Sequence, residues 1–222
     1  ALMLHLDVTA AEKPYVLVNY LQLGIDLWGI VQAGGTDNWV PNGGHANGRK
    51  WPILFAGLMF GDTAMQNLGA GDGTGVAYFG EDAQTFYVDD DAIAATSGAG
   101  WSPDSRTPDP QRYDSTTIDM PEWGIRHATD PTRNDASWNA TYRTCCTANS
   151  WSGQVLAARI MGAKALWAHD PVFDYQDRYM AIMNGDPDPF EYTVNGQPST
   201  PQGLRTWSSF EGDMWDTYRP LY

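Results

Sequence analysis

Residues 11–35, AEKPYVLVNYLQLGIDLWGIVQAGG, are apolar at almost every position. The polar exceptions Asn19, Gln22 and Asp26 fall on one narrow helical stripe, and a pair of glycines ends the run, which predicts a long and largely buried helix. A lone carboxylate on such a helix is costly to bury. We therefore expect Asp26 either to pair with Arg49 or to act as a catalytic base.

Further helical patterns follow along the chain. A second apolar helix is predicted from about residue 49 to residue 66, and it would form an antiparallel αα-hairpin with the first. Helices are also predicted from residue 150 to 170, after residue 170, and close to the C-terminus, where Ser208 or Ser209 can provide the cap with Thr206. The prediction is a mainly α chain, with residues 1–222 as a single helical domain.

Residues 67–149 break the helical pattern and are predicted to be an irregular insert. Two short alternating runs, VAYF and QTFYV, lie on either side of Gly80-Glu81-Asp82, which predicts a small β-hairpin. A Pro-, Asp- and Ser-rich stretch follows, and loops of that length are usually functional.

Composition excludes several functions. The net charge is −14, so nucleic acid is not an expected partner, because phosphate binding needs a basic face. No stretch approaches the roughly 20 apolar residues of a membrane span, so no membrane association is expected.

The two cysteines, Cys145 and Cys146, are adjacent, and neighbouring cysteines rarely form an unstrained disulfide, so we expect small half-buried side chains.

A basic cluster, His45, Arg49 and Lys50, comes just before or in the first turn of the second helix. Cations are unfavourable at that end of a helix, so a negative group must lie nearby. If that group is a ligand, Arg49 would clamp a carboxylate or sugar hydroxyls, and His45 would act as acid or base. If it is structural, Arg49 and Lys50 would pair with Asp26 or Asp62.

Two further segments place acids beside aromatic rings. In PEWGIRH, Glu122 adjoins Trp123, and an apolar ring can raise the pKa of a carboxyl while offering a face to a sugar. Asp177 lies between Tyr175 and Tyr179 and is the best candidate for a second carboxylate. The structural alternatives are a Trp tucked inward from a surface loop and a solvated acidic helix face.

The remaining candidates would bind substrate. His127 is the last residue of PEWGIRH, and Trp51 directly follows the basic cluster. Tyr142 and Arg143 are the residue types that β-elimination on uronates requires: Arg neutralises the carboxylate, and Tyr transfers protons.

Four segments, GGHANGRKWPILFAG, PEWGIRH, WSGQVLAARIMGAKALWAHDPVFDYQDRYM and MWDTYR, resemble part of a secreted bacterial (α/α) toroid, a fold built from αα-hairpins and common among glycoside hydrolases and polysaccharide lyases. The resemblance implies an incomplete toroid and an extracellular or periplasmic location. The chain would then be the C-terminal part of a longer polypeptide, a proteolytic remnant, or a smaller helical fold unrelated to toroids. It also implies a polysaccharide or oligosaccharide as the partner. Self-association or a missing N-terminal half would cover the exposed apolar surface of a half-ring.

The sequence is compatible with three functions. The leading one is a glycoside hydrolase with paired carboxylates (Glu122 with Asp177) in an aromatic-lined cleft. The alternatives are a polysaccharide lyase acting on uronates and a non-catalytic glycan-binding or assembly module. The chain has only four histidines, so we expect neither a zinc site nor another cofactor. The Asp-rich stretches 88–91 and 185–189 could hold only structural calcium, and neither follows an EF-hand loop.

Overall fold

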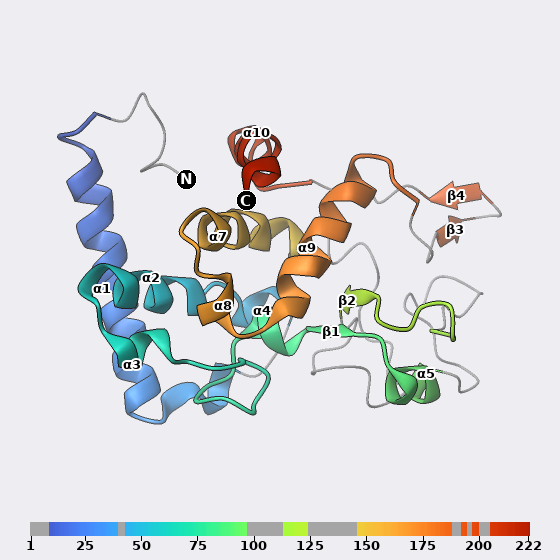
Figure 1. Cartoon of the computed structure of the whole chain (residues 1–222), viewed down its shortest axis with the longest axis horizontal. Coiled ribbons are helices and arrows are strands. Elements are labelled where there is room, and N and C mark those ends of the chain that lie inside the picture. The colour runs from blue at the N-terminus through green and yellow to red at the C-terminus, as the bar shows by residue number, and fades with distance from the viewer. Residues whose placement is uncertain are drawn as a thin grey trace.

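The computed structural model describes residues 9–39, 43–96, 113–123, 146–187, 192–194, 197–199 and 205–222. Helices predominate among these residues, so the expected mainly α class is confirmed. The elements are arranged along the long axis of the molecule. The first helices lie at one end, the central helices follow, and the small strands lie toward the other end (Figure 1).

The α-helices are α1 (Lys13–Gln32), α2 (Lys50–Phe60), α3 (Thr63–Gln66), α4 (Gly80–Ala83), α5 (Asp90–Thr96), α7 (Ala148–Ile160), α8 (Lys164–Trp167), α9 (Asp170–Met183) and α10 (Ser209–Tyr218). Within the described residues, 3-10 helices form at η1 (Gly35–Trp39), η2 (Gly43–Ala46) and η3 (Arg219–Leu221). Two antiparallel pairs of strands complete the description: β1 (Thr85–Tyr87) with β2 (Pro121–Trp123), and β3 (Tyr192–Val194) with β4 (Gln197–Ser199).

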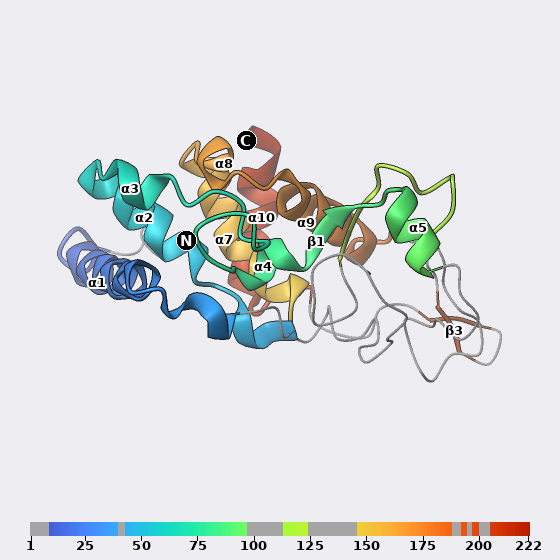
Figure 2. The ribbon, with the colours of Figure 1, turned by 90° about the horizontal axis from the view of Figure 1, so that it is seen from below.

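Helix α1 packs on α2, as the sequence predicts, but it is not largely buried. Its inner stripe, which includes Tyr20 and Gly24, contacts α2: the rings of Tyr20 and Phe55 are 5.3 Å apart, and Gly24 lies against the backbone of Pro52. Its outer face exposes large apolar side chains, namely Tyr15, Val16, Val18, Leu23, Ile25 and Ile30. The expected burial was wrong because α1 stands at the edge of the molecule with its inner face alone on the core (Figure 2).

The core lies where α2, α7, α8 and α9 meet, and aromatic rings dominate it. The ring of Trp167 stacks on Trp51 at 6.4 Å and meets Phe173 edge-on at 5.3 Å. The rings of Trp151 and Tyr175 join α7 to α9 at 6.2 Å. Many of the aromatic side chains in the described residues are therefore used in core packing.

Two predicted helices are each interrupted. Gly61 ends α2 in the left-handed conformation with φ 69°, and the side chain of Asp62 then caps α3, so the run predicted for residues 49–66 is two helices. Gly162, at φ 66°, separates α7 from α8 in the same way. Glycine adopts this conformation without the steric cost that a Cβ brings, so each break is encoded locally.

The hairpin predicted around Gly80-Glu81-Asp82 is wrong. Those residues form α4, and β1 pairs instead with β2, so that Phe86 lies opposite Glu122. Contacts of the α4 side chains with distant segments, described below, override the local alternating pattern. In the described part of the chain, no helix combines the length and apolar character needed to cross a membrane.

Candidate functional site

The basic cluster before α2 finds its negative partner inside the protein. Lys50 is fully buried, and its ammonium pairs with the buried carboxylate of Asp82 on α4. It also donates to the carbonyls of Gly69 at 2.9 Å and Trp167 at 2.5 Å. The partner is thus a carboxylate of the chain itself, but not Asp26 or Asp62, the two that the sequence suggested.

Glu81, next to Asp82, is a second fully buried acid. Its Oε2 accepts a hydrogen bond from the backbone amide of Gly48 at 3.1 Å, whereas its Oε1 has no hydrogen-bond partner among the described residues. Burial, reinforced by the neighbouring charge of Asp82, raises the pKa of Glu81 to about 7. No motif marks this residue in the sequence, where it is one of many acids.

The other two members of the cluster remain near the surface. His45 is exposed on η2, and its carbonyl accepts a hydrogen bond from Arg49 Nη2 at 3.1 Å. The Arg49 guanidinium lies over the Trp39 ring, 5.1 Å from its centre, and its Nη1 is buried without a hydrogen-bond partner in the described part of the chain. Arg49 is therefore half-buried against an aromatic ring, and Lys50 is sealed inside.

Glu122 lies on β2 with 7% of its side chain exposed, and Arg178 of α9 is its ion-pair partner at 3.2 Å. Glu122 Oε1 also accepts from the amide of Trp123 at 2.9 Å, and Arg178 donates to the carbonyl of Pro121 at 2.9 Å. These contacts stabilise the ionised form of Glu122. A carboxylate held in this way suits a nucleophile or a charge stabiliser better than the proton donor suggested by its Trp neighbour.

Asp177 and Asp26 lie in different surroundings from those predicted. Two guanidinium groups hold Asp177: Arg159 at 2.6 Å, and Arg219 through bonds of 2.7 Å to each carboxylate oxygen. Asp26 is exposed on α1 and accepts from Gln22 at 2.8 Å, so it is neither buried nor paired with Arg49. In the described residues, Asp177 acts as a structural link between α7, α9 and η3.

The predicted aromatic faces are part of the core. Trp51 is 4% exposed and Trp123 is 2% exposed, so both rings are packed against protein. His127, Tyr142 and Arg143 lie outside the described residues. Of the predicted pair, Glu122 lies on β2 and Asp177 on α9, and arginine side chains bind both carboxylates.

Cys146 corrects the prediction for the adjacent cysteines. It is disulfide-bonded, and the sequence contains one other cysteine, Cys145. The carbonyl of Cys146 lies against Gly44, where a Cβ would approach it to 2.4 Å. Gly44 is therefore needed for the close approach of the loop that carries His45 to the start of α7.

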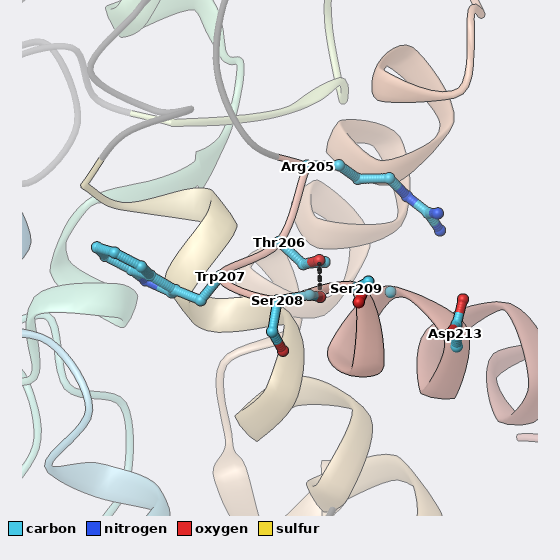
Figure 3. Close-up of a pocket in the computed structure, with 7 residues that line it drawn as sticks. Arg205, Thr206, Trp207, Ser208, Ser209 and Asp213 are labelled. Carbon is cyan, nitrogen blue, oxygen red and sulfur yellow. Dashed lines mark hydrogen bonds between the residues drawn. The ribbon is translucent and has the colours of Figure 1, made fainter.

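A hollow with a volume of about 450 Å³ opens at the start of α10. Its lining consists of Arg205, Thr206, Trp207, Ser208, Ser209, Gly212 and Asp213. Trp207 and Arg205 extend to opposite sides of this hollow, and the hydroxyl of Thr206 donates to the carbonyl of Ser208 at 2.7 Å (Figure 3). Sequence reasoning missed Trp207, although its place just before the predicted helix cap was a usable signal.

The polar groups of the hollow have defined roles. Ser208 caps α10 by accepting from the amide of Glu211 at 3.2 Å, as the sequence predicts. Arg205 donates to both oxygens of Asp216, and these hydrogen bonds hold the pKa of Asp216 below its usual value. Asp213 is exposed, and Trp207 has 60% of its surface exposed. The hollow therefore combines an open aromatic ring, hydroxyls and an exposed carboxylate.

Among the described residues, no group of three or more His, Cys, Asp or Glu side chains is arranged to hold a metal ion. Compared with known proteins, the chain matches no family model, and no curated protein or solved structure is significantly similar to it.

Proposed function

We propose that this protein binds a neutral saccharide in the hollow at the start of α10, with Trp207 as the surface on which a sugar ring stacks. The observation that carries the proposal is the 60% exposure of Trp207 beside the hydroxyls of Ser208 and Ser209 and the carboxylate of Asp213. An aromatic ring offers apolar area to the C–H face of a sugar, and hydroxyls and carboxylates bond its O–H groups.

Charge supports a neutral ligand rather than a uronate. The cation in the lining, Arg205, is already paired bidentately with Asp216, so Asp213 leaves the hollow with a net negative charge. The chain as a whole carries −14, which repels a polyanion at long range. These charges favour binding of a neutral glycan over the polyuronate lyase activity that the sequence also allows.

Titration of tryptophan fluorescence with neutral oligosaccharides, and with uronate oligosaccharides of equal length, tests the proposal. We expect neutral sugars to bind and Trp207→Ala to weaken binding by at least about tenfold. Tyr15→Ala, which removes an exposed ring from distant α1, is the matched control and should bind normally. Binding by no neutral sugar, or equal binding by Trp207→Ala, would overturn the proposal.

Glycoside hydrolysis is the second candidate, and the position of Glu122 favours it. An ionised carboxylate held by Arg178 next to Trp123 has the chemistry of a glycosidase nucleophile or charge stabiliser. Release of reducing ends from neutral polysaccharides, lost in Glu122→Gln at a temperature where the variant stays folded, is the expected result. A product absorbing in the ultraviolet would instead indicate β-elimination.

The finer architecture is a proposal of the same kind. Packing of α1 on α2 and of α7 on α9 supports helix pairs as in part of an (α/α) toroid. An experimental structure of the natural full-length chain tests this, because helix pairs that do not follow one another around a common axis would contradict it.

A further inference from the structure

The segment of residues 43–48, which consists of η2 and the two residues after it and is called loop 43–48 below, is hydrogen-bonded to one short helix and its cap. Gly48 donates its backbone N–H to Glu81 at 3.1 Å, and Gln84 donates to the carbonyl of Gly43 at 2.9 Å. Gln84 also reaches Asn47 at 3.3 Å. Both ends of the loop are thus attached to side chains of α4 and its C-terminal cap.

Among these attachments, Glu81 is the one whose environment disfavours a charge. It is fully buried, and one of its carboxyl oxygens has no hydrogen-bond partner in the described part of the protein. The nearby cation, Lys50, is already paired with Asp82. If Glu81 were ionised, the buried group of three would carry a net negative charge, which is unfavourable away from water.

The groups around Glu81 reinforce this preference. Burial and Asp82 on α4 oppose a negative Glu81; the hydrogen bond from the Gly48 amide and the charge of Lys50 on α2 favour it, but less strongly, so the pKa of Glu81 stays raised. Tyr20 on α1 also faces Glu81. Burial raises the pKa of this tyrosine, and the charge of Glu81 raises it further. His45 on η2 is exposed. His169, which precedes α9, hydrogen-bonds Thr85 at the start of β1, directly after α4.

We propose that Glu81 is a proton-operated latch for loop 43–48: the neutral carboxyl keeps the loop seated on α4, and loss of its proton favours opening. The loop is the natural route to hydration because Gly48, the residue bonded to Glu81, is itself exposed. Opening would free His45 and Arg49 from their present positions. The inference rests on the buried cluster and is independent of the proposed saccharide site.

The sign of the effect follows from proton linkage. In the open loop Glu81 titrates as an ordinary carboxyl, whereas in the closed loop its pKa is raised to about 7. Opening therefore releases a proton between the two values. The opening equilibrium should increase by about two orders of magnitude as pH rises from 4.5 to 7, and then level off.

Amide hydrogen exchange on the intact protein tests the latch. After correction for intrinsic exchange rates, protection of the Gly48 amide should fall about a hundredfold between pH 4.5 and pH 7.5, and at each pH it should stay well below that of the Tyr179 amide in α9, which reports global unfolding. In Glu81→Gln the Gly48 amide should show no such pH dependence. Glu211→Gln, on α10, is the matched control and should behave as the parent does.

Three results would overturn the proposal: flat protection in the parent protein, an unchanged pH slope in Glu81→Gln, or protection of the Gly48 amide equal to that of the Tyr179 amide at every pH, which would mean that the loop opens only by global unfolding. If Glu81→Gln does not fold, ¹³C-detected titration of the Glu81 carboxyl in the parent decides the matter. An ordinary carboxyl titration below pH 5 then contradicts the latch, and titration near pH 7 together with the Gly48 response supports it.

Discussion

Lys50 and Asp82 form an ion pair in which both side chains have 0% exposure. The carboxylate of Asp82 also accepts from the amide of Gly71 at 2.9 Å and from the indole of Trp167 at 2.6 Å. One buried pair thereby connects α2, α4 and α8. Because both charges are fully buried, removal of one partner leaves the other inside the protein without a counter-ion.

Lys50→Met should therefore destabilise the protein strongly. We expect a loss of roughly 3–5 kcal/mol in the free energy of unfolding, because Asp82 would stay buried without its cation. Urea denaturation followed by circular dichroism measures it. Lys164→Met is the control, since Lys164 is 37% exposed and pairs with Asp170 and Asp174 at 3.4 and 3.3 Å. It should cost less than about 1 kcal/mol, and equal losses would contradict the buried-pair argument.

Glu81 makes a separate contribution to the pH dependence of global stability. Its pKa is raised to about 7 in the folded protein, so its neutral form is favoured on folding. That contribution is fully present below the unfolded pKa and is lost as pH rises to about 7, a change of about 3 kcal/mol. The difference in unfolding free energy between the parent and Glu81→Gln, measured at pH 4.5 and pH 7.5, should change by that order. A pH-independent difference would refute the assignment.

The state of the cysteines gives a chemical prediction. Because Cys146 is disulfide-bonded and Cys145 is the other cysteine of the sequence, the purified chain should contain no reactive thiol. Iodoacetamide should leave its mass unchanged under denaturing, non-reducing conditions, and should add two alkyl groups after treatment with a dithiol reductant. Mass spectrometry reads both results, and alkylation before reduction would show that the bond is absent.

Local sequence signals predicted the helices well. The extent of α1, the Ser208 cap of α10 and the helix after residue 170 all follow from patterns within a few residues. Pairings over long separations were not predictable in this way. Phe86 pairs with Glu122 across the irregular insert, and side chains of α4 bind Gly48 and Lys50 at the start of α2, so the predicted hairpin turn is a helix.

The candidate site shows the same division. Physical chemistry required an anion near Lys50, and a carboxylate is there, but nothing in the sequence distinguishes Asp82 from Asp26 or Asp62. Asp177 resembled a catalytic acid because its neighbours in sequence are aromatic, whereas its neighbours in space are Arg159 and Arg219. The pairing of Asp177 is set by packing of α7 and η3 on α9, which no periodicity reports.

Two glycines of α1 provide a matched test of how that helix is seated. A Cβ on Gly24 would lie 2.3 Å from the carbonyl oxygen of Pro52, whereas a Cβ on Gly29 would meet no atom within 4 Å. Gly24→Ala should therefore destabilise by roughly 1–3 kcal/mol, because the backbone of α2 must move. Gly29→Ala should stabilise by about 0.5–1 kcal/mol, because alanine loses less backbone entropy in a helix. Thermal unfolding of both variants measures the difference, and effects of the same sign would mean that α1 does not pack on α2 at Gly24.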